Sequence, residues 1–187
     1  MKKSLGLFLL LSLSTAGNAA ESLGRAGGWG IYYDAGGEGD CYAAASYEGG
    51  DRFFIGIKST NKAWYFQFEN PNWTSIVPGN TYQIKYRFGR TTWTGPTEGY
   101  TNGLLASSLK ESFIRDIAAR GSLTIYYAGN KLGSYSLRGT RKAINAVEQC
   151  YKTHILKYDP FSSAPGGSSA DPFAGGNGGG GGDPFAR

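Results

Sequence analysis

Two cysteines limit the folds open to this chain more than any other feature. The sequence has 187 residues, and Cys41 and Cys150 are its 2 cysteines. Upstream of the second cysteine, Ala143, Ile144 and Val147 recur with it at three- and four-residue spacing. This period places the four side chains on one face of an amphipathic helix that faces the core. Cys150 therefore points inward, and the sequence predicts that it bonds Cys41 and closes the residues between them into one covalent loop.

The first 20 residues predict a cleaved secretory signal peptide. Two lysines precede a short apolar run at residues 5–13, and small residues then lead to Glu21, the first acidic residue. A positive start, an apolar centre and a small-residue exit are typical of such signals, and this run is too short to span a bilayer. We therefore expect a periplasmic or secreted bacterial protein, peripheral to the membrane at most, in a compartment where disulfides form.

The net charge is mildly positive. Removal of the signal would take the 19 Lys and Arg residues to 17, against 14 Asp and Glu, so the mature net charge would be +3. Such an excess is compatible with anionic partners without requiring them. Because the sequence has no nucleic-acid-binding motif, we do not expect nucleic acid as a partner.

Residues 21–158 predict one mainly β domain. Aromatic residues make up 14% of the chain and glycines number 30, a composition that favours strands joined by turns. Residues 81–88 alternate apolar and polar side chains, as in an antiparallel strand with one buried face. We expect an antiparallel β-sandwich or flattened barrel with two covering α-helices. One helix would begin at the capping-box pattern of residues 108–111, and the other would end at Cys150. The glycine-rich residues 24–28 are expected to be a flexible lead-in.

The segment 159–187 predicts a disordered C-terminal tail. Proline, glycine, serine and alanine dominate it, and no periodic apolar face is present. Three Asp-Pro-Phe units begin at residues 159, 171 and 183, a constant spacing of 12, and they place Phe161, Phe173 and Phe185 as the bulky apolar side chains. A protein partner could bind these phenylalanines through multivalency. The alternative is a low-complexity tail without a partner.

Positive and aromatic residues near the predicted strand at 81–88 form the candidate ligand-binding surface. They are Lys85, Arg87, Arg90 and Trp93. Guanidinium groups beside an indole can hold sulfate, phosphate or carboxylate groups, including those of an anionic envelope glycan. The alternative is a charged outer face that keeps the sheet soluble.

No catalytic residue, metal site or cofactor is predicted. His154 is the single histidine and lies beyond the last predicted helix, while both cysteines are assigned to the disulfide. The acidic residues within 34–40 do not have the spacing of a calcium-binding loop, so an ordinary turn is expected.

The chain resembles small exported alphaproteobacterial proteins of the invasion-associated locus B type. The resemblance covers residues 29–151. It rests on the signal, the cysteine pair and the following residues: Trp29, Leu137, Gly139, Ala143, Val147 and Cys150. It implies a protein of the periplasm or cell surface without catalytic residues to transfer. The Asp-Pro-Phe tail is not part of the pattern.

These observations predict an exported, non-enzymatic binding or envelope-associated protein that recognises a protein partner or an anionic glycan. One alternative is an inhibitor of an envelope or host hydrolase. Another is a hydrolase that depends on carboxylates. A pocket with two carboxylates of raised pKa would favour the hydrolase, whereas an exposed aromatic patch would favour the binding protein.

Overall fold

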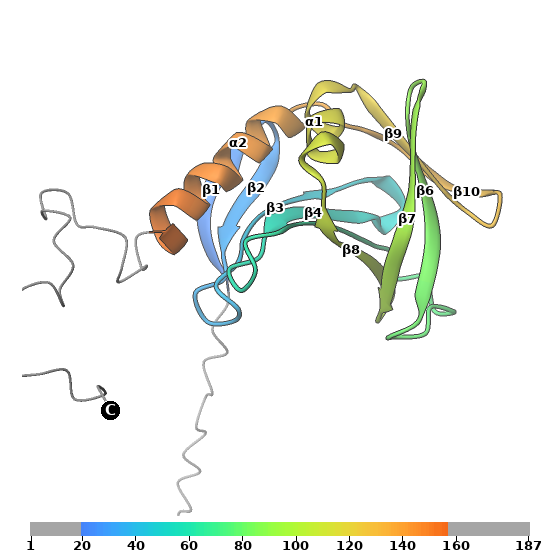
Figure 1. Ribbon diagram of the computed structural model, residues 1–187, viewed down its shortest axis with the longest axis horizontal. Helices are drawn as coiled ribbons and strands as arrows, with labels where there is room; N and C mark the ends of the chain where they lie inside the picture. The colour runs from blue at the N-terminus through green and yellow to red at the C-terminus, as the bar shows by residue number, and fades with distance from the viewer. Residues whose placement is uncertain (1–19, 157–187) are drawn as a thin grey trace, which may run out of the picture.

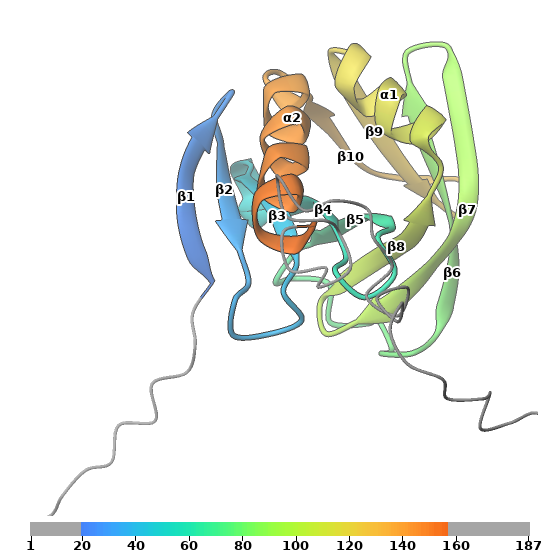
Figure 2. The same ribbon diagram turned by 60° about the vertical axis from the view of Figure 1, so that its left-hand side comes forward.

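Residues 20–156, the part of the chain that the computed structural model describes, build one ten-stranded antiparallel sheet with two helices on its inner face (Figures 1 and 2). The strands are β1 (Glu21–Ala26), β2 (Trp29–Tyr33), β3 (Cys41–Ser46), β4 (Arg52–Ile57), β5 (Trp64–Glu69), β6 (Thr81–Phe88), β7 (Thr91–Tyr100), β8 (Gly103–Leu109), β9 (Ser122–Tyr127) and β10 (Asn130–Ser136). The helical elements are α1 (Glu111–Ala119), α2 (Thr140–Cys150) and the short turns η1 (Glu48–Gly50) and η2 (Tyr151–Ile155). The predicted signal peptide, apart from Ala20, and the predicted tail with its Asp-Pro-Phe units lie outside the described residues.

The sheet is curved and open. Its strand order is β1-β2-β3-β4-β5-β8-β7-β6-β9-β10, so β1 and β10 are its two edges. Both edge strands carry a break in register, between Ser22 and Gly24 in β1 and between Lys131 and Gly133 in β10. The predicted antiparallel β fold with two covering helices is confirmed, and the strands form one continuous curved sheet that does not close into a barrel.

Strand β6 shows how the sequence determines the two faces of the sheet. Ile84, Tyr86 and Phe88 are buried, whereas Lys85 and Arg87 between them are exposed. Because successive side chains of a strand point to opposite faces, the apolar set lines the inner face and the charged set lies on the outer one. Phenylalanine and isoleucine side chains of β4, β5 and β9 extend this inner face into a continuous core.

The two helices cover the inner face of the curved sheet. α2 contacts β1, β2, β3 and β4, and it also contacts α1. Figure 2 shows both helices on the same side of the sheet. Ile144 and Val147 of α2 are buried, as are Phe113 and Ile117 of α1. A fully buried side chain of this kind contributes about 1.5–3 kcal/mol, so the four together contribute on the order of 10 kcal/mol.

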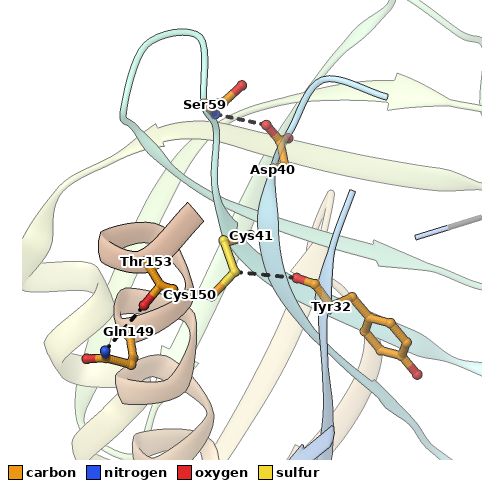
Figure 3. The surroundings of a disulfide bond; sticks show 7 residues. All are labelled: Tyr32, Asp40, Cys41, Ser59, Gln149, Cys150 and Thr153. Carbon is orange, nitrogen blue, oxygen red and sulfur yellow. Dashed lines mark hydrogen bonds between the residues drawn. A yellow bond between two sulfur atoms is a disulfide. The ribbon is translucent and has the colours of Figure 1, made fainter. Parts of the chain in front are cut away.

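The predicted disulfide is confirmed. It joins Cys41, the first residue of β3, to Cys150, the last residue of α2, across 109 positions of sequence, with the two Cα atoms 5.9 Å apart (Figure 3). The Sγ atom of Cys150 also lies 3.9 Å from the carbonyl oxygen of Tyr32. A disulfide sulfur carries no proton, so this is a packing contact. The bond therefore holds the end of α2 against β2 and β3.

Two strands were not predicted from the sequence. The first is β1. The prediction of a flexible lead-in at residues 24–28 is wrong, because β1 pairs along β2 and a tight turn at Gly27 and Gly28 joins the two strands. The second is β8, whose Leu104 and Ala106 are buried against β5. It runs through the residues expected to start a helix, so α1 begins only at Glu111 and its N-cap is Lys110. Strand pairing therefore overrides the local capping-box pattern.

The turn between β1 and β2 packs backbone to backbone against the start of α2. Gly139 is the N-cap of α2 and has a φ of 82°. A Cβ atom on Gly139 would collide with the carbonyl group of Gly27. By contrast, Gly129 in the β9–β10 turn has a φ of 84°, and an added Cβ would meet no atom within 4 Å.

We expect Gly139→Ala to destabilise the fold by at least about 2 kcal/mol, because both a strained φ and a backbone collision result. Gly129→Ala is the matched control and should cost about 1 kcal/mol, since only its φ is strained. Urea unfolding followed by circular dichroism measures both. Equal losses would contradict the close contact between the β1–β2 turn and α2.

Replacing both cysteines with serine should cost roughly 3–5 kcal/mol, because the bond restricts a loop of more than a hundred residues in the unfolded chain. For a domain of this size the melting temperature should fall by about 10 °C or more. Reductant should lower the melting temperature of the unmodified protein to that of the double variant and leave the variant unchanged. Two reactive thiols in the unreduced, denatured protein would contradict the bond.

Candidate ligand-binding surfaces

The outer face of β6, β9 and β10 carries three positive side chains around one aromatic ring. Lys85 lies opposite Tyr126 of β9, and Tyr126 in turn lies opposite Lys131 of β10. Arg87 belongs to the same face, and its Cζ atom is 5.3 Å from the centre of the Tyr126 ring. Within residues 20–156, Lys85, Arg87 and Lys131 form no ion pair. We call Lys85, Arg87, Lys131 and Tyr126 the basic face.

Acidic side chains are distant from the basic face. The register places Glu98 of β7 on the same side of the sheet, but opposite Thr81. Thr81 is four residues from Lys85 along β6, a separation of about 13 Å. This exceeds the screening length of about 8 Å at physiological salt, so the positive charge of the basic face stays largely uncompensated.

The structure separates two of the predicted binding residues from this face. Arg90 is exposed at the turn between β6 and β7. Trp93 lies opposite the buried Tyr86 and so belongs to the inner face. Its ring contacts Phe113 at 5.8 Å between ring centres, and its Nε1–H donates a hydrogen bond of 2.8 Å to Asp116 of α1. Trp93 therefore joins β7 to α1, and Tyr126 is the aromatic side chain beside Arg87.

A second candidate site is an apolar pocket that the sequence did not reveal. It has a volume of about 250 Å³ and lies between the β5–β6 connection and strands β6, β8, β9 and β10. Its apolar lining residues are Trp73, Ile76, Tyr82, Leu104, Tyr127 and Leu132, with Asn72 and Ser75 alongside. These residues come from separate segments, so no local motif marks the pocket. We call this site the apolar pocket.

Hydrogen bonds and ring contacts hold the walls of the apolar pocket in place. The backbone N–H of Val77 donates to the Tyr82 hydroxyl at 2.9 Å, and the rings of Tyr82 and Tyr127 pack edge to face at 5.5 Å. The ring of Trp73 packs edge to face on Phe68 at 5.6 Å. The pocket remains open to solvent, because Tyr127 is 41% exposed. It is therefore an ordered, accessible apolar surface.

The acidic loop between β2 and β3 is held against the residues that follow β4. Burial raises the pKa of Asp40, whose carboxylate accepts a hydrogen bond of 2.9 Å from the backbone N–H of Ser59, as Figure 3 shows. Glu38 pairs with Lys58 at 3.1 Å. Among residues 20–156, no group of three or more His, Cys, Asp or Glu side chains is placed to hold a metal ion. The contacts of Asp40 and Glu38 indicate a structural role.

His154 is half-buried. It lies in η2 and stacks on the Tyr33 ring with 4.5 Å between ring centres. This contact joins the turn after α2 to the end of β2.

None of the helices among residues 20–156 has the length and apolar character needed to span a membrane.

Comparison with known proteins identifies the fold. No protein-family model and no curated protein matches the chain. Among solved structures, the chain is similar to invasion associated protein b from Bartonella henselae, with 10% sequence identity and a TM-score of 0.53. The alignment covers 72% of this chain and 99% of that one. The two proteins share a fold. The resemblance expected from the cysteine pair and the closing helix is thus confirmed at the level of architecture.

We expect Trp93→Phe to destabilise the domain by about 1–2 kcal/mol, because the hydrogen bond to the Asp116 carboxylate is lost. Urea unfolding followed by circular dichroism measures this. Binding to an acidic polysaccharide should not change, since Trp93 lies on the face opposite Lys85 and Arg87. Lost binding with unchanged stability would instead make Trp93 a ligand contact.

Proposed function

We propose that this protein is an exported, non-enzymatic binding protein of the bacterial envelope, and that it binds an anionic glycan through the basic face. The observation that carries the proposal is the gathering of Lys85, Arg87 and Lys131 around Tyr126 without an acidic partner. Export is supported by the signal pattern of residues 1–20 and by the disulfide, which forms in oxidising compartments. The structural neighbour's name refers to invasion, which is consistent with the cell surface.

The basic face suits an extended acidic chain. Lys85 and Arg87 are two residues apart on one strand, about 7 Å, and Lys131 lies two strands away from Lys85, about 10 Å. A polysaccharide lying across the strands would meet Lys131 first and then the pair of Lys85 and Arg87. Arg87 can bind a carboxylate or phosphate through two N–H groups, and the Tyr126 ring offers a flat surface for a sugar ring.

The protein fold holds this face rigidly. Lys85 and Arg87 are in the interior of β6, which pairs with β7 on one side and β9 on the other. The backbone of both residues is therefore fixed, and only the side chains lose freedom on binding. Exposed contacts of this kind contribute about 0.5 kcal/mol each, so three of them correspond to roughly tenfold in affinity.

The triple variant Lys85→Ser, Arg87→Ser, Lys131→Ser should bind polygalacturonate about tenfold more weakly than the unmodified protein. It should also show a smaller dependence of affinity on salt, because fewer charges take part. Biolayer interferometry from about 50 to about 300 mM NaCl, roughly a third to twice the physiological ionic strength, measures both.

The matched control removes three positive charges elsewhere. Lys110, Lys142 and Lys152 are exposed on or beside the helices, and none forms an ion pair within the described residues. Their triple serine variant has the same net charge as the test variant and should retain most of the binding. Neutral dextran should bind none of the three proteins. Equal losses of affinity in both variants would show that binding depends only on net charge, and would overturn the assignment of the basic face.

A further inference from the structure

The apolar pocket matches a side chain that the chain itself carries three times. We propose that the Asp-Pro-Phe units beginning at residues 171 and 183 dock into the apolar pocket of the same molecule, with Phe173 or Phe185 inserted between its aromatic walls. This inference concerns a different surface from the basic face and is independent of glycan binding.

The pocket has the size and the lining that a phenyl ring requires. An apolar cavity of about 150 Å³ is sufficient to bind benzene. The apolar pocket measures about 250 Å³, which leaves room for the ring and for part of the neighbouring proline. Trp73, Tyr82 and Tyr127 offer ring edges and faces, and aromatic pairs gain about 0.5–1.5 kcal/mol beyond the area that they bury.

The pocket also has polar groups suited to the aspartate of each unit. Asn72 and Ser75 lie beside the apolar lining and provide an amide and a hydroxyl donor. Within residues 20–156, neither side chain hydrogen-bonds to another residue. An aspartate two positions before an inserted phenylalanine can accept hydrogen bonds from these donors. The combination of apolar walls and neutral donors fits Asp-Pro-Phe better than it fits a cationic peptide.

The length of the chain after Leu156 selects which units can reach the pocket. Figure 1 shows the end of α2 and η2 on one side of the molecule and β6, β9 and β10 on the other. A domain of this size has a radius of gyration of about 14 Å and so a width of nearly 40 Å. Phe161 follows Leu156 by five residues, a reach of about 17 Å at full extension. Phe173 and Phe185 follow by 17 and 29 residues, reaches of about 58 and 100 Å.

Covalent attachment makes docking within one molecule stronger than docking between molecules. A glycine- and serine-rich linker of this length corresponds to an effective concentration of the tethered phenylalanine on the order of millimolar. A single aromatic anchor with a Kd near 1 mM would therefore occupy the pocket in about half of the molecules. At micromolar protein, the same anchor would leave the pocket of a second copy almost empty.

The first test uses the full chain, labelled with ¹⁵N. The double variant Phe173→Ala, Phe185→Ala should shift the backbone amide signals of Tyr82, Tyr127 and Leu132 relative to the unmodified protein. Phe161→Ala is the matched control and should leave these signals unchanged, because this residue cannot reach the pocket. The alanine changes lie outside the described residues, and the loss of a weak tethered contact should lower the melting temperature by only about 1–2 °C.

The second test measures docking in trans. A peptide of residues 169–177 is titrated into the full chain carrying alanine at positions 161, 173 and 185. It should shift the same three amide signals and saturate with a Kd on the order of 1 mM. Leu132→Ser, in the pocket on edge strand β10, should abolish these shifts. The matched control Leu23→Ser changes a 37% exposed leucine on the opposite edge strand β1 and should not.

Other results would overturn the inference. Unchanged pocket signals in the double variant would show that the phenylalanines do not dock. An effect of Phe161→Ala equal to that of the double variant would contradict the reach argument. Pocket shifts that grow with protein concentration, together with a mass above that of the monomer in sedimentation, would assign the phenylalanines to a second copy. Circular dichroism of Leu132→Ser and Leu23→Ser distinguishes a lost contact from a lost fold.

Discussion

The attachment of α2 to the first half of the sheet is the contact on which the rest of the structure depends. An open sheet with a fully apolar inner face leaves that face exposed to water unless another element covers it. α2 covers it with the stripe Ala143, Ile144 and Val147, and the Cys41–Cys150 bond fixes the end of that helix to β3. α1 then packs beside α2, and its Phe113 contacts aromatic side chains of β5, β6 and β7.

The two candidate sites follow from the alternation of side chains along β6 and β9. Tyr126 and Tyr127 are neighbours in sequence but lie on opposite faces of β9, one in the basic face and the other in the apolar pocket. The helices cover the inner face at one end, and the pocket lies where the β5–β6 connection covers it only in part. One strand pair can therefore present a charged surface and an aromatic pocket that act independently.

Much of this architecture could be predicted from local pattern, and the exceptions have physical causes. Alternation marked β6, and helical spacing marked α2 and its inward cysteine. β8 was missed because its Ala-Ser-Ser centre has little pattern of its own and its pairing with β5 is what makes it a strand. The sequence predicts Trp93 beside Lys85, whereas the neighbour of Lys85 on β7 is Thr94. A difference of one residue in register moves a side chain to the other face, and sequence alone does not determine register. The apolar pocket needs the tertiary fold to assemble it.

The breaks in register at the two edges of the sheet affect how readily the edges pair with another chain. An open sheet ends in unpaired N–H and C=O groups that can recruit a strand of another chain and begin a polymer. At Ser22 and Gly24 on one edge, and at Lys131 and Gly133 on the other, the extra residue disturbs the even spacing that such growth requires. The same irregularities that bend the edge strands thus make both edges poor templates for pairing with a strand of another chain.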